Sequence, residues 1–488
     1  MKDNLMLKND THEVVVGLEI HAQLKTKSKA FCSDKVAFGA SPNTLVSPVS
    51  LGHPGTLPVH NKEAINMAIM LGLACDCDIR SYNSYSRKNY FYADLPKGYQ
   101  ITQLDTPICN GGGVDILLSD GTSKLINLTR IHMEEDTGKG IHDLDIYNTL
   151  MDYNRAGTAL VEIVTEPDFR SGEEAYNFLS EVRKLVRYLG ICDGNMEEGS
   201  LRCDANVSVR PLGSKDFGTK VEVKNMNSMS NVKKAIEFEF NRQSKMALAG
   251  EEIFSETRSF DAVKGTTFSM RSKELVNDYR FFPEPDLPPL IIDQAWIDKL
   301  KERMPALPKE LIARFTSEYS LGAYDAEILT EQKDIADYFI LVCEYSTNYK
   351  AAANWVMGPV KGWVNSNASS IEKFPLSPKA IALIIEFIDE GVINFSVAEQ
   401  KLFPALLLNP KQEVSQLIEK LNLKQTGDED TLHQLIQEVL DENPNKVQEY
   451  KAGKTGLIGM FMGQIMKKSG GKADPKKTKN LLVKLLDN

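Results

Sequence analysis

An alternating run near the start of the chain, Val14 to His21, most limits how this protein can fold. Its apolar residues recur at every second position: Val14, Val16, Leu18 and Ile20. This is the period of a β-strand with one buried face. Glu19 and His21 then share the other face, about 7 Å apart at the rise of an extended chain. Such a pair can converge on a metal ion or a phosphate, or it can simply face water.

A second run with the same period, 201–210, carries Asp204 among its polar positions. A link rich in turn-forming residues connects it to 220–224, where Glu222 and Lys224 share one face. The two runs predict an antiparallel hairpin whose polar faces coincide. A third stretch places His132, Glu134, Glu135 and Asp136 within five positions.

We therefore expect one carboxylate-rich cleft, formed by Glu19, His21, Glu134 (or Glu135), Asp204 and Glu222. Oxygen ligands with a single imidazole favour Mg²⁺ or Mn²⁺ over zinc. Mg²⁺ held by carboxylates beside Lys and Arg is typical of a phosphoryl-transfer site. The sequence contains no Gly-rich loop ending in Gly-Lys-Ser/Thr, so a nucleotide site here is not of the P-loop kind. The alternative is a solvated sheet face with surface ion pairs.

From Glu13 to about Ile292, short alternating runs are broken by turn sequences such as NGGG at 110–113. The clearest inserted helix is predicted between Ser171, which begins a capping box with Glu174, and Gly190. This pattern predicts an α+β domain built on a largely antiparallel sheet. The run 281–289, with four prolines, is predicted to close it as a connector without regular structure.

Beyond that run the chain is helical by periodicity. The helices predicted include 333–342, 378–390, 414–421 and 432–440. We expect three parts: a cradle-like domain 1–292, an all-α domain 293–408 and a small all-α tail 409–488.

The end of the tail is basic, with ten lysines against three acidic residues from Lys446 onward. Clustered lysines are typical of a surface that binds RNA phosphates, although a solvated tail has the same composition. Five of them are the predicted RNA-binding residues: Lys467, Lys468, Lys472, Lys476 and Lys477.

The net charge of −10 argues against a protein that wraps nucleic acid over its whole surface. The seven cysteines form no C-x-x-C pair, and residues 1–13 contain no apolar signal segment. Reduced thiols in a cytoplasmic compartment fit this pattern. No apolar run reaches the ~18–20 residues of a membrane span, so no membrane partner is expected.

Several long motifs are distinctive. They are VGLEIH at 16–21, RKNYFY at 87–92, DYNRAG at 152–157, EEGSLRCDAN at 197–206 and DYRFFPEPD at 278–286. With these motifs the chain resembles the GatB family, the B subunits of the tRNA-dependent aspartyl/glutamyl amidotransferases (GatCAB complexes). GQIM at 463–466 and ADP at 473–475 resemble the YqeY-like tail of that family.

The resemblance implies a glutamine-dependent amidotransferase, a carbon–nitrogen ligase that works as a heterotrimer. A GatB chain uses ATP to activate the side-chain carboxylate of misacylated Glu-tRNA(Gln) or Asp-tRNA(Asn), and ammonia then forms the amide. The glutaminase partner, GatA, supplies the ammonia through a channel, and the small partner, GatC, braces the pair. A tRNA-docking scaffold without catalytic groups is the alternative.

By position, five residues match the Mg²⁺-binding, ATP-cleaving cluster of the family: Glu19, His21, Glu134, Asp204 and Glu222. Glu135 is the alternative to Glu134, and Lys88 and Lys97 match positions near the channel mouth. Many relatives also carry a four-cysteine zinc knuckle. This chain keeps Cys32 of that set, and Asp34, Ser47 and Ser50 stand at the other three positions, so zinc is not expected.

Overall fold

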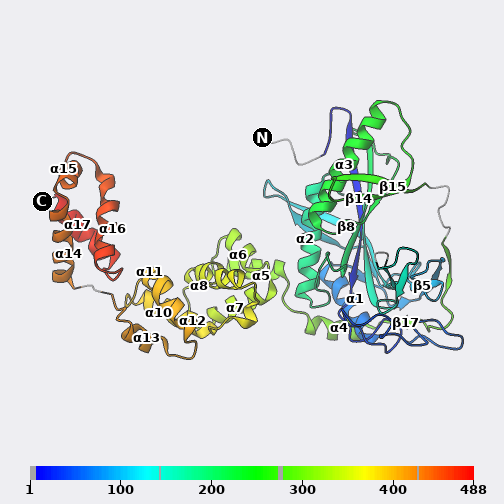
Figure 1. Cartoon of the computed structure of the whole chain (residues 1–488), viewed down its shortest axis with the longest axis horizontal. Coiled ribbons are helices and arrows are strands. Elements are labelled where there is room, and N and C mark those ends of the chain that lie inside the picture. The colour runs from blue at the N-terminus through cyan, green and yellow to red at the C-terminus, as the bar shows by residue number, and fades with distance from the viewer. Residues whose placement is uncertain (1–6, 142–143, 273–278, 426–427, 488) are drawn as a thin grey trace. The chain divides into compact units, whose positions relative to one another are not determined.

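The computed structural model describes residues 7–141, 144–272, 279–425 and 428–487 (Figure 1). Asp278, the first residue of the DYRFFPEPD motif, lies outside these ranges. The chain divides into two compact units, Met1–Leu307 and Pro308–Asn488.

The first unit is built on a 13-stranded sheet with β1 (His12–Gln23) inside it. β12 (Leu201–Pro211) and β11 (Ala159–Thr165) flank β1, and both run antiparallel to it. Beyond β11 the path continues through β8 (Ser123–Glu135), β5 (Tyr99–Thr102), β4 (Ser86–Asn89) and β16 (Arg280–Pro283). Beyond β12 it continues through β13 (Val221–Lys224), β14 (Glu256–Asp261) and β15 (Thr266–Ser272). The predicted β12–β13 hairpin and the largely antiparallel sheet are thus confirmed.

Short strands complete the first unit. They are β2 (Asp78–Ile79), β3 (Tyr82–Asn83), β6 (Cys109–Asn110), β7 (Gly113–Leu117), β9 (Lys139–Ile141), β10 (Leu150–Asp152) and β17 (Leu290–Ile291). Among them, β2, β6 and β7 join the large sheet, while β9–β10 and β17–β3 are separate pairs.

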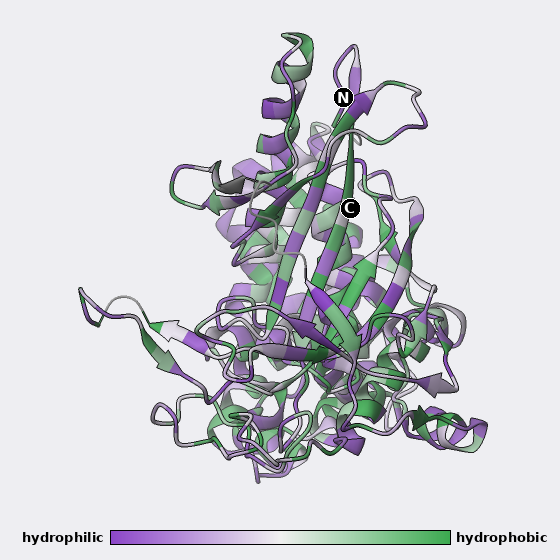
Figure 2. Cartoon of the chain, turned by 90° about the vertical axis from the view of Figure 1, so that its right-hand side faces the viewer, coloured by the Kyte–Doolittle hydropathy of each residue, from purple (hydrophilic) through white to green (hydrophobic). Residues whose placement is uncertain are grey.

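The two faces of the long strands differ in chemistry, because side chains alternate along a strand. Figure 2 shows hydrophobic and hydrophilic residues alternating along the central strands. Val14, Val16, Leu18 and Ile20 are at most 1% exposed and belong to one large apolar cluster. Helices α1 (Lys62–Ala74), α2 (Gly172–Tyr188) and α3 (Met229–Leu248) add apolar residues to it. We call this side of the sheet the core face and the other side the polar face.

Helix α2 confirms the capping box that the sequence predicted. The Ser171 side chain accepts a hydrogen bond from the Glu174 backbone N–H, and Gly190 follows the helix with φ +69°. A left-handed residue just past a helix end satisfies its last carbonyls, and glycine adopts that conformation without strain.

The proline-rich run 281–289 corrects a prediction. Its first residues continue β16, which pairs with β4 in the register Phe281 opposite Lys88. A proline is tolerated on an edge strand or at a strand end, where its missing N–H breaks no ladder. Pro283 is the last residue of β16, at the end of the sheet path, so the strand forms despite it.

Helix α4 (Gln294–Arg303) belongs to the first unit. Its Ile297 and Leu300 join the apolar cluster, and the Trp296 indole N–H donates to Asn66 Oδ1 of α1 at 2.8 Å.

The second unit is helical. The predicted helices 333–342, 378–390, 414–421 and 432–440 are confirmed as α7 (Lys333–Cys343), α10 (Pro378–Asp389), α13 (Val414–Lys420) and α14 (Glu429–Glu442). The other helices are α5 (Pro308–Ser317), α6 (Ala323–Leu329), α8 (Tyr349–Trp355), α9 (Lys361–Ser366), α11 (Phe395–Val397), α12 (Phe403–Leu408), α15 (Pro444–Lys451), α16 (Ile458–Lys468) and α17 (Pro475–Asp487).

The last helices of the chain share a small core of their own. Leu432 and Ile436 of α14 pack with Phe461 of α16 and Leu482 of α17, all fully buried. This core ties α14 to the basic segment that follows it. No helix among the described residues has both the length and the apolar character that crossing a membrane requires.

Candidate functional site

The register of the central strands gathers polar side chains on the polar face. Glu19 lies opposite Asp204, and His21 lies opposite both Arg202 and Glu162. Residues directly opposite one another in a sheet point to the same side. Glu222 lies opposite Asn206, and His132 lies opposite Glu162, so the polar row extends over β13, β12, β1, β11 and β8.

Glu19, Asp204 and Glu222 form the first of two acidic groups, with one oxygen from each lying within 4.8 Å of the others. The Lys224 ammonium lies 2.5 Å from Asp204 Oδ2 and 2.8 Å from Glu222 Oε1. Burial alone would raise the pKa of Glu222, but Lys224 outweighs it and holds the pKa below its usual value. Lys224 therefore favours the ionised form of Glu222.

An unpaired acceptor lies in the first acidic group. Asn206 donates its amide N–H to Glu19 Oε1 at 2.8 Å, and its own Oδ1 is buried without a hydrogen-bond partner in the described structure. Buried polar atoms are almost always paired with protein, water or an ion. Oxygen donors that converge beside an unpaired amide oxygen fit a hard cation such as Mg²⁺.

His21, Glu134 and Glu162 form the second acidic group. His21 Nε2 lies 3.3 Å from Glu134 Oε1 and 3.4 Å from Glu162 Oε2, and His132 Nε2 lies 3.3 Å from Glu162 Oε2. Burial alone would lower the pKa of His21, but the two carboxylates outweigh it and raise the pKa to about 10. The pKa of Glu162 is held well below its usual value, since both histidines outweigh the effect of burial. Each acidic group thus carries a neutralising protein cation.

A cavity of about 210 Å³, which we call the polar pocket, opens beside both groups. Its lining residues are His21, Lys88, Gln100, Glu134, Asp136, Thr137, Leu160, Arg202 and Asp204. Arg202 is fixed by an ion pair with Asp136 at 3.0 Å, and Gln23 donates to the other Asp136 oxygen at 2.6 Å. The pocket combines acidic groups that suit a cation with two basic side chains that suit an anion.

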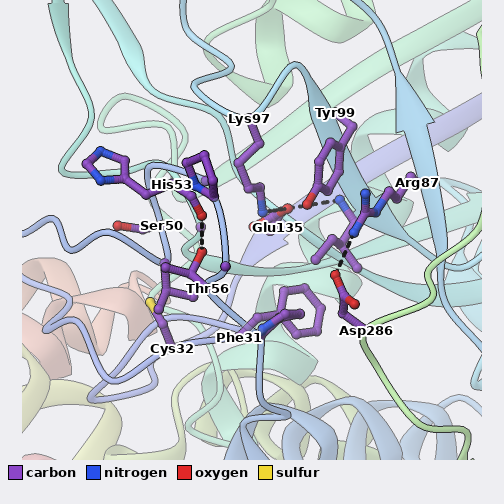
Figure 3. Close-up of a pocket in the computed structure, with 17 residues that line it drawn as sticks. Phe31, Cys32, Ser50, His53, Thr56, Arg87, Lys97, Tyr99, Glu135 and Asp286 are labelled. Atoms are coloured by element: carbon purple, nitrogen blue, oxygen red, sulfur yellow. Dashed lines mark hydrogen bonds and ion pairs between the residues drawn. The ribbon is translucent and has the colours of Figure 1, made fainter.

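A second cavity, of about 260 Å³, lies on the core face, and we call it the core-face pocket. Figure 3 shows Lys97 and Glu135 paired inside it, with Arg87 reaching Asp286 nearby. Glu135 Oε1 also accepts a hydrogen bond from the Ile101 backbone N–H at 2.9 Å. Both members of the Lys97–Glu135 pair are at most 9% exposed, so the pair is largely shielded from solvent although it lines this cavity.

The five predicted metal ligands all lie on the polar face, where the structure divides them between the two acidic groups. Glu135 lies on the core face, one residue along β8 from Glu134. The two predicted channel lysines are also separated: Lys88 lines the polar pocket and Lys97 the core-face pocket. Lys88 lies opposite Gln100, and Thr102, two residues further along β5, lies opposite Glu134, so Lys88 and Glu134 are on the same side of the sheet. Lys97 pairs with Glu135 on the other side, and the sheet therefore runs between the two lysines.

The predicted RNA-binding lysines lie on or beside α16 and α17. Lys467 and Lys468 end α16, Lys472 follows it, and Lys476 and Lys477 are in the first turn of α17. Lys468 is ion-paired with Glu438 at 3.1 Å and with Glu442 at 2.6 Å, both on α14.

Glu162 was missed by the sequence reasoning. It stands in the apolar run LVEIV at 160–164, where a lone carboxylate interrupts a buried strand. That interruption was the available signal, because a charged residue in such a strand requires a partner.

The residues at the zinc-knuckle positions do not fit zinc. Ser50 Oγ donates to Asp34 Oδ2 at 2.5 Å, and the Ser47 backbone N–H donates to Ser50 Oγ at 3.0 Å. Burial raises the pKa of the Cys32 thiol to about 11, so it stays protonated. One protonated thiol beside a carboxylate and two hydroxyls lacks the thiolate set that a structural zinc site uses.

Two family models match this chain, one within each of its two compact units. Residues 14–298 match the family model described as the GatB/GatE catalytic domain, and residues 337–486 match a model described as the GatB domain. The chain is 47% identical over 475 residues to the B subunit of the aspartyl/glutamyl-tRNA(Asn/Gln) amidotransferase of Thermodesulfovibrio yellowstonii, covering 97% of this chain and 99% of that protein. The proteins of the same name from a Synechococcus species (47% over 481 residues, 98% of each chain) and from Trichlorobacter lovleyi (48% over 472 residues, 97% and 98%) are similarly close. The family resemblance is therefore confirmed, and this chain belongs to the GatB/GatE family.

Proposed function

We propose that this chain is the GatB component of a glutamine-dependent amidotransferase that acts on aminoacyl-tRNA. It converts misacylated Glu-tRNA(Gln), Asp-tRNA(Asn) or both into Gln-tRNA(Gln) and Asn-tRNA(Asn), together with a glutaminase partner, GatA, and a small partner, GatC. The observation that carries this proposal is the pair of acidic groups beside one pocket that also holds Lys88 and Arg202.

The reaction has two steps. An oxygen of the substrate's side-chain carboxylate attacks the γ-phosphorus of ATP, and ADP leaves, which gives an acyl phosphate. Ammonia then attacks the acyl carbon, and inorganic phosphate leaves as the amide forms. Lys88 and Arg202 attract the anionic substrates, and Asp136 and Gln23 fix Arg202 in place.

Glu19, Asp204 and Glu222, with His21 and Glu134 beside them, are the residues that would hold Mg²⁺. Bound there, the ion supplies neutralisation of charge on the transferring phosphoryl group. Without the ion, Lys224 and protonated His21 offset the repulsion among the carboxylates on the polar face, and His21 would have to release its proton to bind Mg²⁺.

For the ammonia route we propose a path across the sheet. Lys97 and Glu135 stand on the core face and Lys88 stands on the polar face, with β4, β5 and β8 between them. An ammonium ion must lose a proton before it can act as a nucleophile, and Glu135 is a carboxylate on this path. This placement supports an entry on the core face and a delivery point at the polar pocket.

Replacing Glu19 or Asp204 by Ala tests the catalytic assignment. We expect both variants of the reconstituted complex to lose ATP-dependent phosphate release and amide formation with Glu-tRNA(Gln). Glu13→Ala is the matched control, since Glu13 lies on the same strand and face, about 20 Å from Glu19, and pairs with Arg210. Undiminished activity in the Glu19 and Asp204 variants would overturn the assignment.

We also propose that the chain has three parts, with the predicted boundary at 292 moved to Leu307 because α4 packs in the core of the first unit, and with the second boundary kept near 409. In the last part, the residues proposed to contact RNA phosphates are Lys467, Lys468, Lys472, Lys476 and Lys477. A truncation should begin before Asp428, because cutting at Lys446 would strip α14 of its partners in the small core. Removing 428–488 should weaken tRNA binding and flatten its salt dependence, while activity persists at high tRNA concentration. Loss of all function at saturating tRNA would instead support a scaffold without catalytic groups.

A further inference from the structure

We propose that four aromatic side chains beside the polar pocket form a stacking surface for the unpaired 3′-terminal nucleotides of the RNA substrate. Tyr90, Tyr92, Tyr279 and Phe281 make up this surface, which we call the aromatic rim. The inference rests on the proposed function and adds where the RNA end is held.

The rings of the aromatic rim follow one another in edge-to-face contacts. The Tyr92 and Tyr90 rings are 6.0 Å apart, Tyr90 and Tyr279 are 5.5 Å apart, and Tyr279 and Phe281 are 6.4 Å apart. Tyr92 is 55% exposed, Tyr279 46% and Phe281 36%, although large apolar rings normally avoid water. The rim therefore offers several ring faces in succession to a ligand.

The aromatic rim is continuous with the polar pocket. Lys88 lines that pocket, and its ammonium lies 4.6 Å from the centre of the Tyr279 ring and 5.8 Å from that of Tyr90. Tyr90 Oη donates a hydrogen bond to Gln100, which also lines the pocket. Phe281 and Lys88 are directly opposite in the sheet, so both point to the polar face.

The polar pocket itself cannot hold nucleobases well. No Phe, Tyr or Trp lines it in the described part of the chain, and its cavity of about 210 Å³ suits the reacting carboxylate and phosphate rather than a chain of bases. The bases next to the esterified amino acid must lie outside it. The adjoining surface pairs aromatic rings with the Lys88 cation, which is the chemistry that binds single-stranded nucleic acid.

A succession of rings fits several neighbouring bases better than the single adenine of ATP. We therefore assign the rim to the RNA end, and binding of the ATP base there becomes an outcome of the test.

The test measures binding of the reconstituted complex to uncharged tRNA with its 3′-terminal nucleotides and to the same tRNA without them. The variants are Tyr279→Leu and Tyr92→Leu, which keep apolar bulk but remove the ring. We expect each to weaken binding of the complete tRNA about tenfold and to leave the truncated tRNA unaffected. Tyr279→Phe should restore binding, and Phe254→Leu, at a 65% exposed ring elsewhere on the first unit, is the matched control.

Salt dependence separates stacking from charge. Tyr279→Leu should leave the slope of log K against log salt unchanged, whereas Lys88→Gln, which removes the cation beside the rim, should reduce it by about one. Equal loss of affinity for both tRNAs, no preference of the wild type for the complete tRNA, or a raised KM for ATP alone would each overturn the proposal. Failure of the proposed function would appear separately, as no amide formation by the wild-type complex.

Discussion

The two faces of the sheet at β8 carry the same kinds of side chain in very different states. Glu134 on the polar face shares His21 with Glu162 and borders an open pocket. Its neighbour Glu135 on the core face is buried against Lys97 and a backbone N–H. Both carboxylates are almost fully buried and each lines a cavity, so one residue of strand alternation separates an acid grouped with a histidine and a second carboxylate from an acid paired with a lysine. The difference teaches that position on the pleat, rather than residue type, decides which cavity an acid lines and which partners it meets.

The largest expected effect comes from changing these two neighbours separately. With ammonium chloride as nitrogen donor, Glu134→Gln should lower ATP-dependent amide formation roughly 1,000-fold, because it removes an ionic oxygen from the polar pocket. Glu135→Gln should stay within about threefold of wild type under the same conditions. With glutamine as donor, Glu135→Gln should lose at least about tenfold.

Phosphate release and amide formation by the reconstituted complex provide the measurement. If both variants lost the same amount of activity with ammonium chloride, the proposed difference between the two faces would be wrong, because both acids would then act in amide formation itself.

A smaller effect is expected on the free energy of unfolding when a lysine is removed from one face or from the other. Lys97→Met leaves Glu135 buried without its ion partner and should cost about 3 kcal/mol of unfolding free energy. Lys224→Met on the polar face should cost no more than about 1 kcal/mol, because Lys224 is 37% exposed and solvent screens the carboxylates it leaves. Urea unfolding of the full chain measures both. A larger cost for Lys224→Met would contradict the contrast between a buried lysine and a partly exposed one.

The smallest effect concerns acid stability beside the core-face pocket. Burial alone would raise the pKa of Asp34, but hydrogen bonds from Ser50, Ser47 and Cys32 and the Lys29 charge hold it below its usual value. Because the folded-state pKa is depressed, the stabilisation is present above about pH 4 and is lost as the pH falls through the folded-state pKa.

Ser50→Ala should therefore cost about 1 kcal/mol at pH 7 and less at pH 3. Thermal unfolding at the two pH values measures this difference. An equal cost at both would show that the hydroxyl does not act through the Asp34 charge.

Much of the sheet could be predicted because its signals are local. The alternation in Val14 to Ile20 required one buried face, and the two runs around Asp204 and Glu222 required a hairpin. The capping box at Ser171 fixed the start of α2. The run 281–289 was misjudged because proline content describes the residue itself and not its place at a sheet edge, where an absent N–H breaks no hydrogen bond.

The sequence predicted which residues form the candidate site, but it did not predict which of them lie next to one another. Alternation placed Glu19 with His21 and Asp204 with Asn206, but the partner of each strand cannot be read from the strand alone. The register of β11 between β1 and β8 brings in Glu162, which bridges His21 and His132. The β1–β11 pairing joins segments more than 100 residues apart, and no local signal specifies it.

The sequence by itself determined the family, the α+β and helical parts, and which residues could bind a cation, because motifs and periodicity are properties of short segments. Only the tertiary structure decided that the acids divide into two groups, each with its own protein cation, and that Lys88 and Lys97 stand on opposite sides of one sheet. The physical reason is that side-chain direction alternates with each residue, while strand order and register are set by packing across the whole unit.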